Sequence, residues 1–188
     1  MTLQRFDVLL RTELKGRLLR GHASVFDQAA QMPGHLEVIS ATAFKRVLDD
    51  AATDVRALWN HNPDHLLGRQ SSGTLRLGTD SEGLEFEVDL PDTTLGRDVQ
   101  VLAERGDISG ASFAFVPGDD EWSTVEGRRV RTHTSVARLL DVSPVTFPAY
   151  EGASVTLRSF PTTQPVSLRG RLVLARYRAL NASGGRLL

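Results

Sequence analysis

The chain has 188 residues and a net charge of −1, from 22 basic and 23 acidic side chains, so it has no basic surplus of the kind that binds nucleic acid. It contains no cysteine, which excludes disulfides, thiolate metal sites and a cysteine nucleophile. Hydrophobic residues make up 40% of the chain, enough to bury a core without cross-links. The N-terminal segment has no apolar run long enough for a signal peptide or a membrane span, so we expect a soluble intracellular protein.

The first 51 residues are predicted to form three strands and then a helix. Ser40 is a good N-cap and would begin a helix over residues 41–51, with its apolar side chains on one face. The strands expected before it lie at residues 6–10, 17–26 and 37–39, with a loop rich in turn residues at 27–35.

The next segment is predicted to be strand and hairpin. Residues 54–62 form a strand that ends in a turn at Asn62–Pro63. A hairpin follows over residues 73–90, because apolar and acidic side chains alternate with the period of a half-buried strand. The apolar members of this alternation are Leu84, Phe86, Val88 and Leu90.

A second helix is predicted over residues 91–107. Thr93 or Thr94 would cap its first turn, and Gly106 is the residue expected just past its end. Its buried stripe consists of side chains spaced at i, i+4 and i+7, namely Leu95, Val99 and Leu102.

The stretch RGDISGASFAFVPG, residues 105–118, predicts a strand with a serine at its centre. Side chains alternate across a strand, so Phe113 and Phe115 share one face and Ser112 lies on the other. We expect the phenylalanines to face the core. Ser112 would then point away from it, between a glycine and an alanine that leave room for a substrate.

Two or three more strands are expected over residues 119–150, with a turn at Glu126–Gly127. The sum is about seven strands joined mostly by short links, which favours antiparallel pairing. We predict a mainly β fold, a closed or nearly closed antiparallel β-barrel with the helices packed outside. Residues 1–160 would form one domain, and residues 161–188 a linker and a basic tail.

Ser112 would be a nucleophile if the fold supplied an imidazole base and a group that orients the imidazole. His61 is a candidate base, and Asp141 or His133 could be the third group. In a regular strand Asp141 shares a face with Leu139 and Ser143, away from Leu140 and Val142. The alternative is that the serine, the histidine and the third group are all structural residues without a catalytic role.

A metal site at His61 and His65 is the other possible function of these histidines. His61 and His65 have the i, i+4 spacing of a ligand pair, but Pro63 between them disfavours a regular helix and no third ligand is evident. We therefore expect neither a metal nor a cofactor.

The chain resembles the tailed-phage prohead (procapsid) maturation proteases, serine peptidases similar in fold to the herpesvirus assemblins. The resemblance runs from about Gly21 to Ala153. It is carried by five stretches in order, GHASVFD, EVISATAF, VRALWNHNPDHLLGR, GRDVQVLAERGDISGASFAF and LLDVSPVTFPAY.

The resemblance implies roles for individual residues. It places the general base on His61 and the nucleophile on Ser112 rather than on the neighbouring Ser109. It favours Asp141 as the third member, with His133 as the alternative because assemblins use a second histidine. Oxyanion donors would be backbone N–H groups or one of the arginines at positions 128, 129, 131 and 138.

The implied function is a serine endopeptidase that acts inside the procapsid, in the host cytoplasm. It would cleave the major capsid protein precursor and its scaffold or delta segment, and then digest itself, with the basic tail as a targeting segment that is removed. The assemblin likeness leaves a homodimer open, and no nucleic acid or membrane partner is expected. The alternatives are an inactive assembly module with the same fold, or a hydrolase with other substrates; the chain has no GxSxG elbow around Ser112.

Overall fold

The computed structural model describes residues 4–9, 13–15 and 17–146. Within them the fold is mainly β, with thirteen strands and two helices. The elements are β1 (Gln4–Leu9), β2 (Glu13–Lys15), β3 (Leu18–Val25), β4 (Ala30–Met32), β5 (His35–Ile39), α1 (Lys45–Asp49), β6 (Arg56–Trp59), β7 (Asn62–Arg69), β8 (Leu75–Thr79), β9 (Gly83–Asp89), α2 (Thr94–Glu104), β10 (Gly110–Pro117), β11 (Asp120–Val125), β12 (Arg128–His133) and β13 (Val136–Val145).

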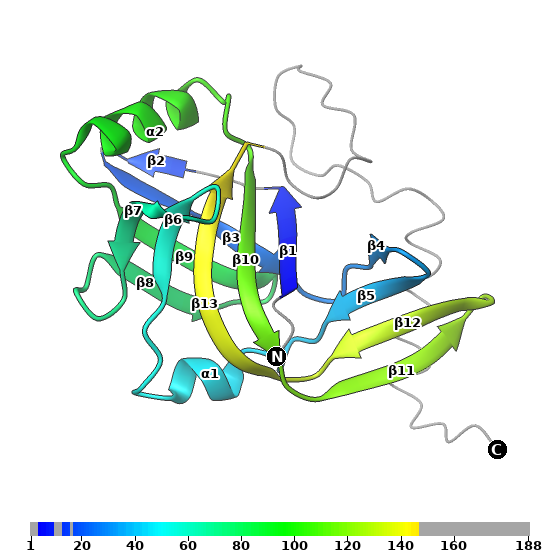
Figure 1. Ribbon diagram of the computed structural model, residues 1–188. Helices are drawn as coiled ribbons and strands as arrows, with labels where there is room; N and C mark the ends of the chain where they lie inside the picture. Colours follow the sequence, from blue (N-terminus) through cyan, green and yellow to red (C-terminus); the bar gives the residue numbers. More distant parts are fainter. Residues whose placement is uncertain (1–3, 10–12, 16, 147–188) are drawn as a thin grey trace.

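The described strands form three sheets, of order β1-β10-β13-β6-β7, β11-β12-β5-β4 and β2-β3-β9-β8. Figure 1 shows β3, β8 and β9 crossing behind β10 and β13, with the β11–β12 hairpin projecting to one side. Strand β1 lies beside β3 and strand β7 beside β9, so both edge strands of the five-stranded sheet approach the inner strands of the sheet that contains β9. The mainly β prediction is confirmed, but no sheet of the described strands is closed on itself, and the predicted closed or nearly closed barrel is not confirmed.

The main core lies between the sheet that contains β10 and the sheet that contains β9. It combines side chains from β3, β8 and β9 with side chains from β6, β7, β10 and β13. The four alternating residues of the predicted hairpin over residues 73–90 are all at most 3% exposed. Strands β8 and β9 pair antiparallel as that alternation predicts.

Strand β10 is held in this core by aromatic packing. The rings of Phe113 and Phe115 stack with their centroids 4.9 Å apart, and Phe44 meets Phe113 edge-on at 5.4 Å. Each such aromatic pair adds about 1 kcal/mol beyond the area it buries. The prediction that both phenylalanines face the core is confirmed, and it fixes the face on which Ser112 lies.

Helix α2 forms as predicted. The Thr93 hydroxyl accepts a hydrogen bond from the Gly96 N–H, which satisfies one of the free donors at the N-terminus. Gly106 follows the helix with φ +77°, the left-handed conformation that glycine adopts at lowest cost. Val99 is buried, and Leu95 and Leu102 pack against the core.

The first helix is shorter than predicted. Helix α1 spans only Lys45–Asp49, and Phe44 precedes it without a side-chain cap. Ser40 does accept a hydrogen bond from an N–H, but from Thr42, so it organises a turn before the helix instead of capping it. The predicted loop over residues 27–35 also contains a short strand, β4.

Strand β13 carries an irregularity that corrects the predicted faces. Asp141 is opposite Ala114 on β10, but the next pair is Leu139 with Phe115, so Leu140 has no partner on β10. This bulge turns Leu139 into the core beside Val142. The prediction that Leu139 shares a face with Asp141 was therefore wrong, because the pleat is interrupted between them.

No helix among the described residues is long and apolar enough to cross a membrane. The predicted linker and basic tail, residues 161–188, lie outside the described residues.

Candidate active site

His61 lies in a two-residue turn between β6 and β7. Trp59 pairs with Asn62, so Asn60 and His61 are the turn residues, with φ +54° and +56°. A type I′ turn requires positive φ at both positions, which asparagine tolerates and histidine adopts at a cost. The turn expected at Asn62–Pro63 is thus two residues earlier, and His61 is at its tip rather than at the end of a strand.

Asn60 ties this turn to the end of β13. Its side-chain oxygen accepts the N–H of Thr146 at 2.8 Å, and its amide nitrogen donates to Thr146 Oγ1 at 3.0 Å. The backbone N–H of Asn60 donates to the carbonyl of Pro144 at 3.1 Å. Sequence reasoning missed this residue, although asparagine is the usual residue for such a turn.

Replacing Asn60 tests how much this tether and the positive φ of residue 60 contribute to stability. We expect Asn60→Ala to lower the free energy of unfolding by roughly 2–3 kcal/mol, because two hydrogen bonds are lost and alanine disfavours positive φ. Asn60→Gly loses the same bonds but accepts the backbone conformation, so it should be about 1 kcal/mol more stable than the alanine variant. Urea unfolding of both variants measures this difference. Equal stabilities would show that residue 60 does not have positive φ in solution.

The turn places His61 against Asp141. The Nδ1 atom of His61 is 2.6 Å from Oδ1 of Asp141, and both side chains are nearly buried, at 8% and 11% exposed. Strand β6 runs parallel to β13 with Arg56 beside Asp141, and the hairpin then carries the chain back to bring His61 over the carboxylate. A carboxylate accepts only, so Nδ1 carries the proton and Nε2 is the ring atom left to act as a base.

Ser112 lies on the strand next to Asp141. It is directly opposite Ser143 in the antiparallel pair of β10 and β13, and Asp141 is two residues from Ser143 on the same face. The Ser143 hydroxyl donates to Oδ1 of Asp141 at 2.7 Å. The structure therefore brings His61 and Asp141 into contact and places Ser112 across from Asp141's hydrogen-bond partner.

The Ser112 hydroxyl is the unusual group of this cluster. Its Oγ is buried and has no hydrogen-bond partner among the described residues. Buried hydroxyls are nearly always bonded, and an exception calls for an explanation such as catalysis. The residue is 0% exposed, so the prediction that Ser112 points outward with room for a substrate is wrong for this conformation. Strand β10 is buried on both of its faces along almost its whole length, which alternation along a single strand does not reveal.

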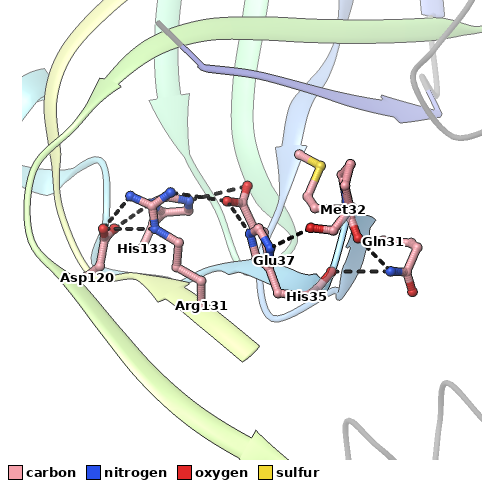
Figure 2. Close-up of polar contacts among 8 residues, drawn as sticks. Gln31, Met32, His35, Glu37, Asp120, Arg131 and His133 are labelled. Carbon is pink, nitrogen blue, oxygen red and sulfur yellow. Dashed lines mark hydrogen bonds and ion pairs between the residues drawn. The ribbon is translucent and has the colours of Figure 1, made fainter. Parts of the chain in front are cut away.

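His133, the alternative third member, lies in another sheet. Figure 2 shows it between the carboxylates of Asp120 and Glu37. Its Nδ1 is 2.7 Å from Asp120 Oδ1, and its Nε2 is 3.5 Å from Glu37 Oε2. Arg131 also reaches both carboxylates. This cluster binds β5, β11 and β12 together, and it leaves Asp141 as the group that contacts His61.

Glu37 is the most buried carboxylate of that cluster, at 1% exposed. Its burial acts to raise its pKa, but hydrogen bonds from His133 and His35 and the charges of His133 and Arg131 outweigh this, so the pKa is lower than usual. A carboxyl group with a lowered pKa stabilises the fold above its unfolded-state pKa, and that stability is lost as the pH falls through the lowered value.

We therefore expect Glu37→Gln to lower the free energy of unfolding by roughly 3 kcal/mol at neutral pH, because Arg131 and His133 each lose one of their two carboxylate partners in a buried cluster. The gap to wild type should begin to narrow as the pH falls below the ordinary glutamate value of 4.5, where residue 37 of the unfolded chain binds a proton, and it should close below the lowered pKa of the folded protein. Urea unfolding across this pH range measures it, with the exposed Glu121→Gln on β11 as the control. A gap that is the same at all pH values would contradict the account.

The arginines considered as oxyanion donors are mostly engaged elsewhere. Arg131 pairs with Asp120, Arg129 lies over the Trp122 ring at 4.3 Å, and Arg128 contacts Gln31. Arg138 is opposite Val116, four residues along β10 from Ser112, or roughly 13 Å at the rise of a strand. Backbone N–H groups remain the better candidates.

The residues considered as a metal pair have separate partners. His61 contacts Asp141, whereas His65 is exposed and lies 3.3 Å from the Asn62 side chain. The part of the chain that the structure describes contains no group of three potential metal ligands. Ser109, the alternative nucleophile, is exposed and precedes β10.

Comparison with known proteins agrees with a serine peptidase. A family model described as caudovirus prohead serine protease matches residues 6–165, and this range includes His61, Ser112 and Asp141. Searches of curated proteins and of solved structures found no match. The family match covers most of the chain, and the chain therefore belongs to the caudovirus prohead serine protease family.

Proposed function

We propose that this chain is the maturation endopeptidase of a phage procapsid, with Ser112 as nucleophile, His61 as general base and Asp141 as the group that orients His61. The observation that carries the proposal is the contact of 2.6 Å between His61 Nδ1 and Asp141 Oδ1, beside a strand whose Ser112 hydroxyl is buried. A further observation supports it: Ser112 lies on the strand next to that of Asp141, opposite the hydrogen-bond partner of Asp141.

The chemistry follows from these positions. Ser112 Oγ attacks the carbonyl carbon of a peptide bond, and its proton passes to Nε2 of His61. The imidazolium that forms is stabilised through Nδ1–H by the Asp141 carboxylate, which stays ionised. Collapse of the tetrahedral intermediate breaks the C–N bond, and Nε2 returns the proton to the leaving amine. Water activated by His61 then hydrolyses the acyl-enzyme by the same steps.

Access to the nucleophile is part of the proposal. Ser112 and Ser143 are 0% exposed, so a peptide bond can reach Oγ only in a conformation that exposes this face. Such a closed resting state would prevent premature cleavage in an enzyme that is enclosed together with its substrates. We place its action in the host cytoplasm, inside the procapsid.

The proposed substrates are the major capsid protein precursor, with its scaffold or delta segment, and then the enzyme itself. Residues 161–188 are proposed as the segment that self-cleavage removes. A homodimer is proposed by analogy with assemblins, and it would be tested by the mass of the protein in solution.

Co-expression with the capsid precursor tests the function. Wild type and Ser112→Ala would each be expressed with the precursor, and the intact masses of all chains would be measured. Trimming of the precursor and shortening of the enzyme only in the wild type support the proposal. Full-length chains in both would favour the inactive assembly module. Casein in place of the precursor tells a specific protease from a general one.

A further inference from the structure

A second seryl hydroxyl lies beside Ser112. Ser143 is opposite Ser112 in the β10–β13 pair, and both side chains are 0% exposed. Directly opposed side chains of an antiparallel pair point to the same face, with their Cβ atoms about 5 Å apart. Ser143 therefore belongs to the same buried surface as the proposed nucleophile, and the proposed mechanism gives it no role.

The Ser143 hydroxyl bonds to the carboxylate that contacts His61. Its distance to Oδ1 of Asp141 is 2.7 Å, and the same oxygen is 2.6 Å from Nδ1 of His61. An ionised carboxylate only accepts, so the hydroxyl donates its proton to Asp141. One carboxylate oxygen thus receives two donors, one from the imidazole and one from β13 itself.

Two donors on one oxygen fix the rotation of the carboxylate. The Asp141 side chain is only 11% exposed, so little water can take the place of a lost donor. A hydrogen bond to a charged group is also stronger than one between neutral groups. Among the described residues, the side-chain donors to Asp141 are His61 and Ser143. Without Ser143, rotation of the carboxylate would be limited by His61 alone, and His61 lies in a turn.

We propose that Ser143 is a positioning residue that acts through Asp141. Its hydroxyl holds Oδ1 where it receives the Nδ1–H of His61, and this keeps Nε2 directed at the nucleophile. The inference rests on the proposed function, because it gives Ser143 a part in the same site. It adds a fourth side chain to the three expected from the sequence.

Fluorophosphonate labelling tests this role. The reagent forms an Oγ–P bond to the active serine, the P–F bond breaks, fluoride leaves and His61 takes the proton. We expect Ser143→Ala to lower the maximal labelling rate by about tenfold, as for a lost hydrogen bond to a charged group, while the concentration for half-maximal rate changes less than twofold. Ser24→Ala, which removes an equally buried serine from β3, is the matched control and should label like wild type.

Two variants of nearly equal shape separate the effect of the hydroxyl at residue 143 from the effect of side-chain packing there. Threonine and valine have the same shape, but only threonine has a donor. Ser143→Thr should label at least several-fold faster than Ser143→Val. Equal rates for the two variants would overturn the inference, because they would show that only volume matters at this position.

A proton NMR spectrum supplies a readout that does not depend on catalysis. The Nδ1 proton of His61, assigned through its absence in His61→Gln, should give a downfield resonance in the wild type that moves or broadens in Ser143→Ala. An unchanged resonance would overturn the proposal for Ser143 whatever the labelling shows. Failure of wild-type enzyme to label at Ser112, with the resonance still moving in Ser143→Ala, would instead overturn the proposed function and leave the Ser143–Asp141–His61 connection standing.

Discussion

Ser112→Ala is expected to lower the rate of precursor cleavage by roughly 10⁴- to 10⁶-fold, the range seen when the nucleophile of a serine protease is removed. The variant keeps the size and apolar surroundings of residue 112 but has no oxygen to form the acyl-enzyme. Since Ser112 Oγ has no hydrogen-bond partner among the described residues, its removal should leave stability nearly unchanged. Initial rates of precursor cleavage and a urea unfolding curve measure the two effects separately.

The control for this variant is Ser109→Ala. Ser109 is exposed and lies three residues earlier in the chain, before β10 begins. The Ser109→Ala variant should cleave the precursor at the wild-type rate. The opposite pattern, with Ser112→Ala active and Ser109→Ala inactive, would identify Ser109 as the nucleophile and contradict the proposed site.

Asp141→Asn should reduce the maximal cleavage rate by roughly 10³- to 10⁴-fold with a smaller effect on substrate affinity. The carboxylate at 2.6 Å keeps the proton on Nδ1 of His61 and stabilises the imidazolium, and a neutral amide does neither well. The exposed Asp49→Asn on α1 is the matched control and should not change the rate. Steady-state kinetics with the precursor give both parameters.

The same kinetics decide between Asp141 and His133. His133 is 0% exposed and sits between Asp120 and Glu37, so its replacement should chiefly lower stability. If Asp141→Asn kept the wild-type rate while a folded His133→Gln variant lost activity, His133 would be the third member and the assignment of Asp141 would be wrong.

Elements with a strong local pattern were predicted well. Helix α2 combines a threonine cap, an apolar stripe and Gly106 at its end, and it forms as these features indicate. The hairpin of β8 and β9 follows from strict alternation. Helix α1 was predicted too long because residues 40–44 form turns, and the N–H of Val136 on β13 bonds to the Ala43 carbonyl. That contact joins distant segments and no local pattern reveals it.

The roles of the three candidate site residues stay predictions, and part of the geometry around them was not foreseen from the sequence. Resemblance placed the roles on His61, Ser112 and Asp141, and strand periodicity put Ser112 opposite the phenylalanines. The bulge at Leu140 was not visible, because a break in register depends on how β10 pairs with β13. The burial of Ser112 likewise depends on neighbouring strands that lie far away in the chain.

Two residues around the site were missed although the sequence held a signal for each. Asn60 precedes the histidine at a position where a two-residue turn favours asparagine. Ser143 is two residues after Asp141, so it shares a face with Asp141 once a strand is assumed. Neither signal was sufficient alone. Asn60 has its role through a hydrogen bond to Thr146, and Ser143 through one to the Asp141 carboxylate, and a sequence pattern does not show such side-chain contacts.

The most direct test of the account is to find the residue that reacts with a fluorophosphonate. The full chain would be labelled in the presence of the capsid precursor, digested and sequenced by tandem mass spectrometry. A single adduct on Ser112 that is absent from His61→Gln is the result we predict, since it shows a nucleophile and its base together. An adduct on another serine, or labelling of Ser112 that persists without His61, would contradict the central claim.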